Sequence, residues 1–317
     1  MSMSCTVLDD GTLAFTDASG APIPEYFVEI SKKQNRQALL ELIQERCDEI
    51  NEQIESLGRL HHDTPNPAEP PRFVAPPFTA PRPEPPPEKR ITLLGRLIPG
   101  RRARIELENK LGTERYQSEV ARWEADRVAF HDQVAVRKRL VEDLIYRDTD
   151  AMERFLEERL AEITWPRETT VTLEVGTSGR AVALDVDLPE FEDMPDKLAA
   201  VPARGLKLSV KELSQTKIQK LYAEHIHGVV FRLVGEAFAA LPTVTTVTVA
   251  GYSQRRDPAT AQLRDDYLVS VRVGRVDWTR LDFAHLASID AIIALQEFDL
   301  RREMSKTGLL KPISPHA

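Results

Sequence analysis

Cysteine and glycine are scarce in this 317-residue sequence, and each shortage excludes a class of site. The two cysteines, Cys5 and Cys47, lie far apart and lack the spacing of metal ligands, so we expect a reducing compartment and no zinc site. The 14 glycines leave few loops that could cradle a phosphate. No glycine-rich phosphate loop, Ser/His/Asp triad or HExxH helix is apparent, so no familiar catalytic motif names an activity.

Long apolar runs and an excess of basic residues are also absent. The most apolar stretch, GVVFRLVGEAFAAL, is interrupted by Arg232 and Glu236 and is too polar to span a bilayer. The beginning of the sequence lacks the basic and apolar segments of a secretory signal. The formal net charge of -8 argues against a protein that coats nucleic acid through bulk charge. These observations predict a soluble cytoplasmic protein without a membrane partner.

Proline, in contrast, is abundant and concentrated in one segment. Residues 63–99 hold 12 of the 22 prolines, including the run PRPEPPPEKR. Because proline lacks an amide donor and restricts the residue before it, this segment is predicted to be extended and unable to form a packed core.

Heptad patterns flank the proline-rich segment on both sides. The first seam has apolar residues spaced by three and four: Leu40, Ile43, Cys47, Ile50, Ile54 and Leu57. The second seam, in which Arg127 and Arg137 take two of the places, is Tyr116, Val120, Trp123, Phe130, Val134, Val141 and Leu144. Heptad spacing is typical of paired helices. We therefore predict an antiparallel helical (coiled-coil) hairpin whose two seams face each other, with the proline-rich segment bridging their ends.

The remaining elements give the domain organisation. Residues 5–16 alternate around Asp10-Gly11, which predicts a β-hairpin within an N-terminal segment at 1–29. The helical hairpin with its proline-rich linker at 63–99 would occupy 30–148, and an α+β domain would occupy 149–317.

The α+β domain is predicted to have the element order αβββαββα. Asp150 with Glu153 marks a capping-box-like helix start, and that helix ends before Pro166. Two strands around Gly176–Gly179, a strand at 205–211 and a long helix at 215–241 capped by Ser214 follow. Two more strands and a helix at about 287–303 complete the domain, and the last seven residues are expected to be loose.

An acidic pair, Asp185 and Asp187, lies in the second strand, RAVALDVDLPE. A hairpin with Gly176–Gly179 as its loop sets the following pairs: Leu173 opposite Val182, Val171 opposite Leu184, Thr170 opposite Asp185 and Glu168 opposite Asp187. The apolar residues then share one face and the acids the other. Like charges across a strand pair are unfavourable. We expect Lys207 and Lys211, on an adjacent third strand, to form salt bridges with this solvated acidic face.

The same arrangement resembles the restriction-endonuclease-like nuclease core. In that family an acid on the second strand binds a divalent ion, and a third-strand acid and lysine complete the site. The resemblance implies Asp185 or Asp187 as the first acid, Lys207 or Lys211 as the lysine and Glu157 as an accessory ligand of Mg²⁺ or Mn²⁺. The sequence departs from the pattern at the third-strand acid, because Gly205 and Ser209 occupy the positions two before each lysine.

A broader resemblance spans residues 35–317. The segments LLGRLIPGRR, WPRETTVTLEV, LDVDLPEFEDMP and GYSQRRDPAT are similar to the C-terminal region of uncharacterised bacterial proteins of unknown function. This resemblance implies a bacterial protein and supplies no activity or catalytic residue.

Two further segments have ordinary explanations. In EHIHG, His225 and His227 are two apart on a helix and therefore on different faces, so we expect His225 to be a hydrogen-bonded core residue rather than a metal ligand. Residues 89–104 carry six basic residues and no acid. We expect their leucines to pack on the domain while the arginines stay in water.

Two functions of different classes follow. The first is a non-enzymatic interaction module that presents the helical hairpin and proline-rich segment to an unidentified protein partner, or that self-associates through the hairpin. The alternative is a metal-dependent nuclease, or a degenerate nucleic-acid-binding relative, built on Asp185, Asp187, Lys207 and Lys211. Whether the chain is an enzyme stays open between them.

Overall fold

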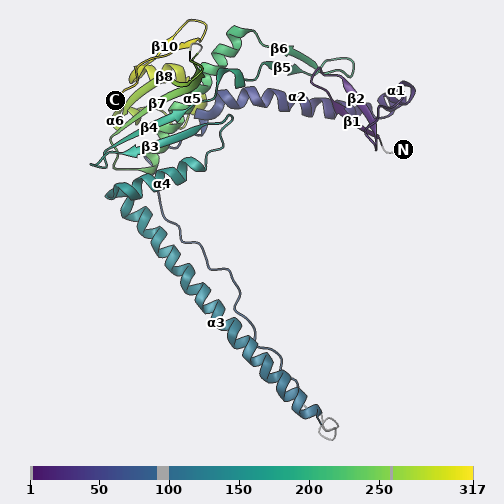
Figure 1. Cartoon of the computed structure of the whole chain (residues 1–317), viewed down its shortest axis with the longest axis vertical. Coiled ribbons are helices and arrows are strands. Elements are labelled where there is room, and N and C mark those ends of the chain that lie inside the picture. Colours follow the sequence, from purple (N-terminus) through teal and green to yellow (C-terminus); the bar gives the residue numbers. More distant parts are fainter. Residues whose placement is uncertain (1–2, 91–99, 258–259, 317) are drawn as a thin grey trace. The chain divides into compact units, whose positions relative to one another are not determined.

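The computed structural model describes residues 3–90, 100–257 and 260–316, which form two compact units. The first unit comprises residues 1–70 and 146–317, and the second comprises 71–145. Helices and a mixed β-sheet confirm the α+β class. Helix α2 (Arg36–Arg59) belongs to the first unit and helix α3 (Arg101–Glu142) to the second (Figure 1). The prediction for the basic segment 89–104 depends largely on residues 91–99, which lie outside the described residues.

A five-stranded sheet is the centre of the first unit. Its strands, in spatial order, are β3 (Thr170–Val175), β4 (Ala181–Asp187), β7 (Thr246–Arg256), β8 (Leu263–Gly274) and β9 (Asp299–Arg301). Strands β4 and β7 are parallel, and every other pair is antiparallel. The long connection between the two parallel strands contains helix α5 (Gln215–Ala240), as a parallel crossover requires.

Helix α5 is the most deeply buried element of the first unit. Ser214 caps it by accepting a hydrogen bond from the backbone N–H of Lys217, which confirms the predicted start. Seventeen of its 26 residues are buried. Helix α5 packs against strand β7 and is covered by α2, while α4 (Thr149–Ala161) packs against both α5 and strand β3 (Figure 1). A helix that is apolar on nearly all sides needs such an enclosed position.

The first predicted seam is confirmed as the buried side of α2, but its predicted partner is wrong. Ile43, Cys47 and Leu57 are buried, and the first two form a cluster with Ala199 and Leu208. Helix α2 packs on α5, on strand β5 (Lys197–Ala200) and on strand β1 (Met3–Val7), all within the first unit. The seam is therefore occupied by these elements and does not pair with the second heptad helix.

The predicted N-terminal hairpin is confirmed. Strand β1 pairs with β2 (Leu13–Asp17), and helix α1 (Glu25–Gln34) follows. In the turn, Gly11 has a φ of 80°, and a Cβ there would lie 2.0 Å from the carbonyl oxygen of Leu208. The N–H of Leu208 also donates to the carbonyl of Gly11 at 2.9 Å. Only glycine fits this turn, because the segment before β6 packs directly onto it.

The third strand of the predicted sheet lies elsewhere. Strand β6 (Ser209–Glu212) pairs with β5 in a separate two-stranded sheet. The side chain of Asn51 on α2 holds this ribbon by two hydrogen bonds of 3.0 Å to the backbone of Ala199. Strand β5 has only four residues and was missed, so the prediction that residues 205–211 join the main sheet is wrong.

Helix α4 begins two residues earlier than predicted. Asp148, not Asp150, is its cap and accepts a hydrogen bond from the N–H of Ala151 at 2.9 Å. Glu153 accepts instead from the backbone N–H of Val175 on β3 at 2.8 Å. Glu153 therefore connects α4 to the sheet rather than closing a capping box.

The predicted C-terminal helix at about 287–303 is wrong. Asp290 caps a new short helix by accepting from the N–H groups of Ile292 and Ile293, so the chain forms several short turns in place of one helix. The short elements in the described part of the chain are the 3₁₀ turns Leu60–Asp63, Leu144–Tyr146, Phe191–Asp193, Leu286–Ser288 and Leu295–Glu297, helices α6 (Arg275–Trp278) and α7 (Ala291–Ala294), and strands β10 (Glu303–Met304) and β11 (Leu310–Lys311).

The C-terminal tail, which was expected to be loose, is anchored to the sheet, because the N–H of His316 donates to Ser270 Oγ at 3.0 Å.

Candidate functional site

Asp185 and Asp187 lie on the face of the sheet that the alternation predicts. Along β4, Leu184 and Val186 are buried, whereas the two aspartates between and beyond them are only half-buried. The phenolic O–H of Tyr267 on β8 donates to Asp185 at 3.0 Å. The acids therefore share the outer face of the sheet with a tyrosine from a strand two positions away.

The predicted register of this hairpin is wrong by two residues. Asp185 lies opposite Thr172, and Asp187 lies opposite Thr170, where Glu168 was expected. The apolar pairs shift in the same way: Val171 lies opposite Val186 and Leu173 opposite Leu184. The turn is two residues longer than Gly176–Gly179 allows, and an even shift leaves each side chain on the same face.

The lysines expected beside the acids are on another sheet. Strand β4 has β3 and β7 as its two neighbours, so no edge of it is left for residues 205–211. Lys211 lies on β6 opposite Leu198, and the charge of Lys207 acts on Asp10 in the N-terminal turn. The expected salt bridges between these lysines and the acid pair therefore do not form.

The remaining member of the nuclease constellation is also isolated. Glu157 is exposed on α4 and borders a hollow of about 330 Å³ beside Trp165 and Val171. Within residues 3–90, 100–257 and 260–316, no three histidine, cysteine, aspartate or glutamate side chains gather closely enough to hold a metal ion. The geometry that the nuclease resemblance implies is not assembled.

Burial and neighbouring carboxylates raise the pKa of both aspartates. For Asp185 the main cause is desolvation, which the hydrogen bond from Tyr267 partly offsets. For Asp187 the causes are desolvation and then the charges of Asp265, Glu168 and Glu190. A raised carboxyl pKa is opposite to the effect of a lysine partner. The pair is therefore a half-buried acidic surface without a neutralising cation from the described residues.

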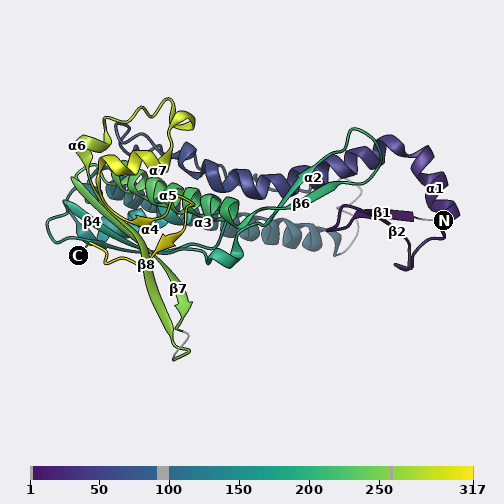
Figure 2. The same cartoon turned by 90° about the horizontal axis from the view of Figure 1, so that it is seen from above.

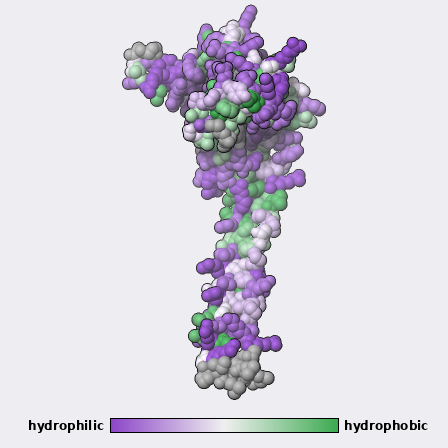
Figure 3. Space-filling view, turned by 90° about the vertical axis from the view of Figure 1, so that its right-hand side faces the viewer, coloured by the Kyte–Doolittle hydropathy of each residue, from purple (hydrophilic) through white to green (hydrophobic). Residues whose placement is uncertain are grey.

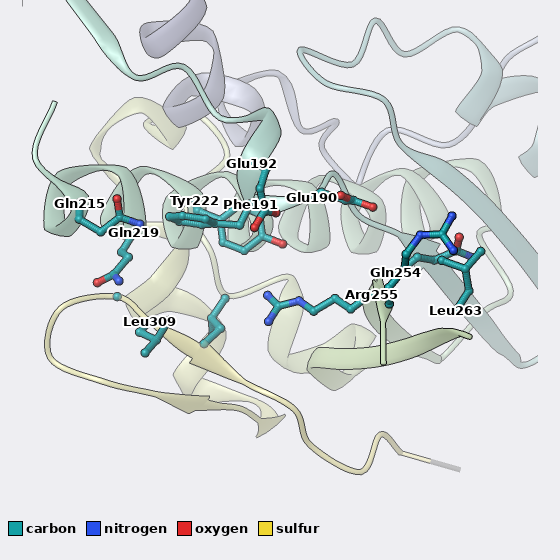
Figure 4. Close-up of a pocket in the computed structure, with 13 residues that line it drawn as sticks. Glu190, Phe191, Glu192, Gln215, Gln219, Tyr222, Gln254, Arg255, Leu263 and Leu309 are labelled. Atoms are coloured by element: carbon teal, nitrogen blue, oxygen red, sulfur yellow. The ribbon is translucent and has the colours of Figure 1, made fainter. Parts of the chain in front are cut away.

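A pocket of about 640 Å³ opens at the carboxyl ends of the parallel strands β4 and β7. The β7–β8 hairpin extends past the end of β4 (Figure 2), and its residues 254–256 and 263 line the pocket. Figure 4 shows residues from five segments around it: 190–192 after β4, the first turns of α5, the end of β7, Leu263 at the start of β8, and 308–310. Ligands of α/β proteins commonly bind in this position.

The lining of this pocket carries balanced charge. Arg255 and Arg256 come from the end of β7, and Glu190 and Glu192 from the segment after β4. Tyr222 closes the floor, where its O–H donates to the Pro189 carbonyl at 3.0 Å; burial, the leading cause, raises its pKa to about 12. The described lining residues include no histidine, cysteine or serine, so the pocket pairs no nucleophile with a base.

The second unit joins the proline-rich segment to α3. Residues 70–90 are extended and run along the helix (Figure 1). The indole N–H of Trp123 donates to the carbonyl of Ala80 at 2.8 Å, and Phe78 packs on Trp123 and Phe130 with ring centroids 5.8 and 5.3 Å away. The N–H of Lys89 and the side chain of Asn109 close the far end with hydrogen bonds of 3.0 and 3.1 Å.

Two arginines complete the contact between the segment and the helix. The guanidinium group of Arg82, in the proline-rich segment, lies 6.0 Å from the centroid of the Trp123 ring. The guanidinium group of Arg127, in α3, lies 5.1 Å from the same centroid. The second predicted seam is thus confirmed as an interaction surface, since Trp123 and Phe130 are two of its three aromatic members. Its partner is the proline-rich segment, which was predicted only to bridge the helix ends.

The opposite side of α3 carries a second row of apolar and small side chains, which was not predicted from the sequence. We call this row the open seam: Leu107, Leu111, Ser118, Ala121, Ala125, Val128, Ala129 and Val136. All eight residues are exposed; Val128 is 56% and Val136 70% exposed. Spacings of three, four and seven place them on one side of a helix. Pale and green patches interrupt the hydrophilic surface of this unit (Figure 3). The sequence signal was present, but small residues made it weaker than the aromatic seam.

No protein-family model, curated protein or solved structure matches this chain. In the described part of the chain, none of the helices is both long enough and apolar enough to cross a membrane.

Proposed function

We propose that this chain is a non-enzymatic interaction protein and that the second unit binds another polypeptide through the open seam of α3. The observation that carries the proposal is the asymmetry of this helix. Its aromatic side is covered by the proline-rich segment, whereas the open seam is exposed along its length. An exposed row of apolar side chains, here interrupted by a few charged ones, commonly marks an interaction site.

The proline-rich segment supports this function by stiffening the helix. A segment rich in proline loses little conformational freedom when it packs, because its backbone is already restricted. The hydrogen bond between Trp123 and Ala80 and the ring contacts of Phe78 with Trp123 and Phe130 join this segment to α3. A rigid surface loses less entropy on binding, so a preformed helix is a suitable docking element.

A photo-crosslinking residue placed in the full-length chain tests the proposal. Val136 on the open seam and Val276 in the first unit are 70% and 72% exposed, so they form a matched pair. With the crosslinker at Val136 we expect a covalent product with another polypeptide chain, and at Val276 we expect none. Equal yields at the two positions, or no product at Val136, would contradict the proposal.

A further inference from the structure

We infer that the polypeptide bound by the open seam is a second copy of this chain, with the two α3 helices antiparallel and the two-fold axis beside residues 126–127. This inference rests on the proposed function and names its partner. The evidence for the antiparallel dimer is the order of the charged residues along the open seam.

Four charged residues alternate along this side of α3: Glu114, Arg122, Asp132 and Arg139. Three of them fall among the open-seam residues, and Arg122 lies at the edge of the row, as 100° per residue requires. The midpoint of Glu114 and Arg139 lies between residues 126 and 127, and that of Arg122 and Asp132 is residue 127. The two midpoints differ by half a residue, about 0.75 Å along the helix axis, so both pairs are arranged about nearly the same point.

An antiparallel pair of helices centred on that point brings opposite charges together. Glu114 of one chain meets Arg139 of the other, Arg122 meets Asp132, and the two-fold axis repeats both contacts. A parallel pair in register would instead set each charge against its own copy. Like charges across a helix interface are unfavourable, so the charge order selects the antiparallel orientation.

The two members of the central pair are too far apart on one helix to pair with each other. Arg122 and Asp132 are about 15 Å apart along the helix axis at 1.5 Å per residue. Neither makes an ion pair with any residue in the described ranges of the chain. A second copy would therefore supply each of these two side chains with its counter-ion.

Each member of the outer pair, Glu114 and Arg139, already has an oppositely charged neighbour on its own helix. Lys110 lies 3.9 Å from Glu114, and Arg139 lies 4.0 Å from Asp143, each one helical turn apart. Lys110 and Asp143 share the midpoint of Glu114 and Arg139, between residues 126 and 127. Antiparallel packing would bring these two ion pairs together as a four-charge cluster at each end, about 25 Å or less from the axis at 1.5 Å per residue.

Small side chains surround the proposed axis. Ala125, Val128 and Ala129 are the open-seam residues nearest to it, and Ala121 follows one turn away. Interaxial distances between helices depend on the side chains at the contact and reach about 8 Å where these are small. Close approach at the centre would let the shorter acidic side chains reach the arginines of the other helix.

The association of the full-length protein tests the inference through its charges. Sedimentation equilibrium should show a dimer, and Arg122→Asp should weaken it about tenfold or more, because two attractive contacts become repulsive. Asp132→Arg should do the same, whereas the double variant Arg122→Asp/Asp132→Arg should restore the dimer. Glu124→Arg, a reversal at an exposed position off the open seam, should leave association unchanged; circular dichroism checks that each variant is folded. A dimer insensitive to both single reversals would overturn the inference.

Disulfide trapping tests the orientation. Ser118 and Val136 are equidistant from residue 127, so mixing a Ser118→Cys chain with a Val136→Cys chain should give a mixed disulfide dimer, in a Cys5→Ser background that leaves only the buried Cys47. Ser118→Cys alone should give little, and efficient formation from that chain alone would indicate parallel helices and overturn the inference. A monomeric protein that still crosslinks a different polypeptide from Val136 would overturn the inference but retain the proposed function. No crosslink from Val136 to any chain would overturn both.

Discussion

His225 and His227 are both completely buried in α5, although they are only two residues apart. His227 donates through Nδ1 to the Ala223 carbonyl and accepts at Nε2 from Arg302. His225 was expected to be hydrogen-bonded, but neither of its ring nitrogens has a partner of normal geometry among the described residues. Burial lowers the pKa of each from 6.5 to about 4; for His225, the nearby carbonyl of Leu57 partly offsets the effect.

These two histidines predict a stability that falls in mild acid. Their folded pKa lies below the unfolded value, so the unfolded state binds more protons between pH 6.5 and pH 4. The contribution of each neutral histidine to the free energy of unfolding is nearly complete above pH 6.5. About 2 kcal/mol of this free energy per histidine should be lost between pH 7 and pH 5. Urea unfolding at the two pH values measures this. His225→Leu should remove about 2 kcal/mol of this loss. A loss of stability that is unchanged in His225→Leu would show that His225 does not contribute.

At the scale of elements, the contact between the proline-rich segment and α3 depends on one side chain. Trp123→Ala removes the hydrogen bond to Ala80, the ring contact with Phe78 and the stacking of two arginines. The loss of such an aromatic cluster costs about 2–3 kcal/mol locally. We expect the segment around Phe78 to loosen from the helix while α3 stays helical and the hydrogen bonds between Lys89 and Asn109 still hold the far end.

Chymotrypsin cleavage after Phe78 measures this release. The Phe78–Thr79 bond should be cut several times faster in Trp123→Ala than in the unmodified protein, with nearly the same helical circular dichroism. Val128→Ala, on the open seam, serves as the control because Val128 lies on the other side of α3 and should not change the rate. Equal cleavage in both variants would mean that Trp123 does not hold the segment.

At the scale of the whole molecule, the two heptad helices belong to different units. Removing residues 71–145 and joining the ends with a flexible linker should leave the first unit folded, because that unit has its own sheet and core. Removing 35–147, which takes away most of the predicted hairpin at 30–148, should instead unfold the remainder. That deletion takes away buried Leu39, Ile43, Cys47 and Leu57 of α2, each worth about 1.5–3 kcal/mol, against a total stability of about 5–15 kcal/mol.

Circular dichroism and urea unfolding of the two deletion variants measure the difference. Cooperative unfolding is expected for the deletion of 71–145 and should be lost in the deletion of 35–147. A cooperative transition in the larger deletion would show that α2 is a removable arm, as the sequence grouping of 30–148 implied.

Local patterns in the sequence determined which face each residue of a helix or strand presents. The alternation in β4 places Asp185 and Asp187 away from the core even though the predicted register was wrong by two, and the spacing in α2 identifies its buried side. Such patterns depend only on the geometry of one element. The partner of each face was decided by the tertiary structure. Strand β4 pairs with β7 instead of residues 205–211, α2 packs on α5, and α3 packs on the proline-rich segment, because these pairings depend on contacts between residues distant in the chain.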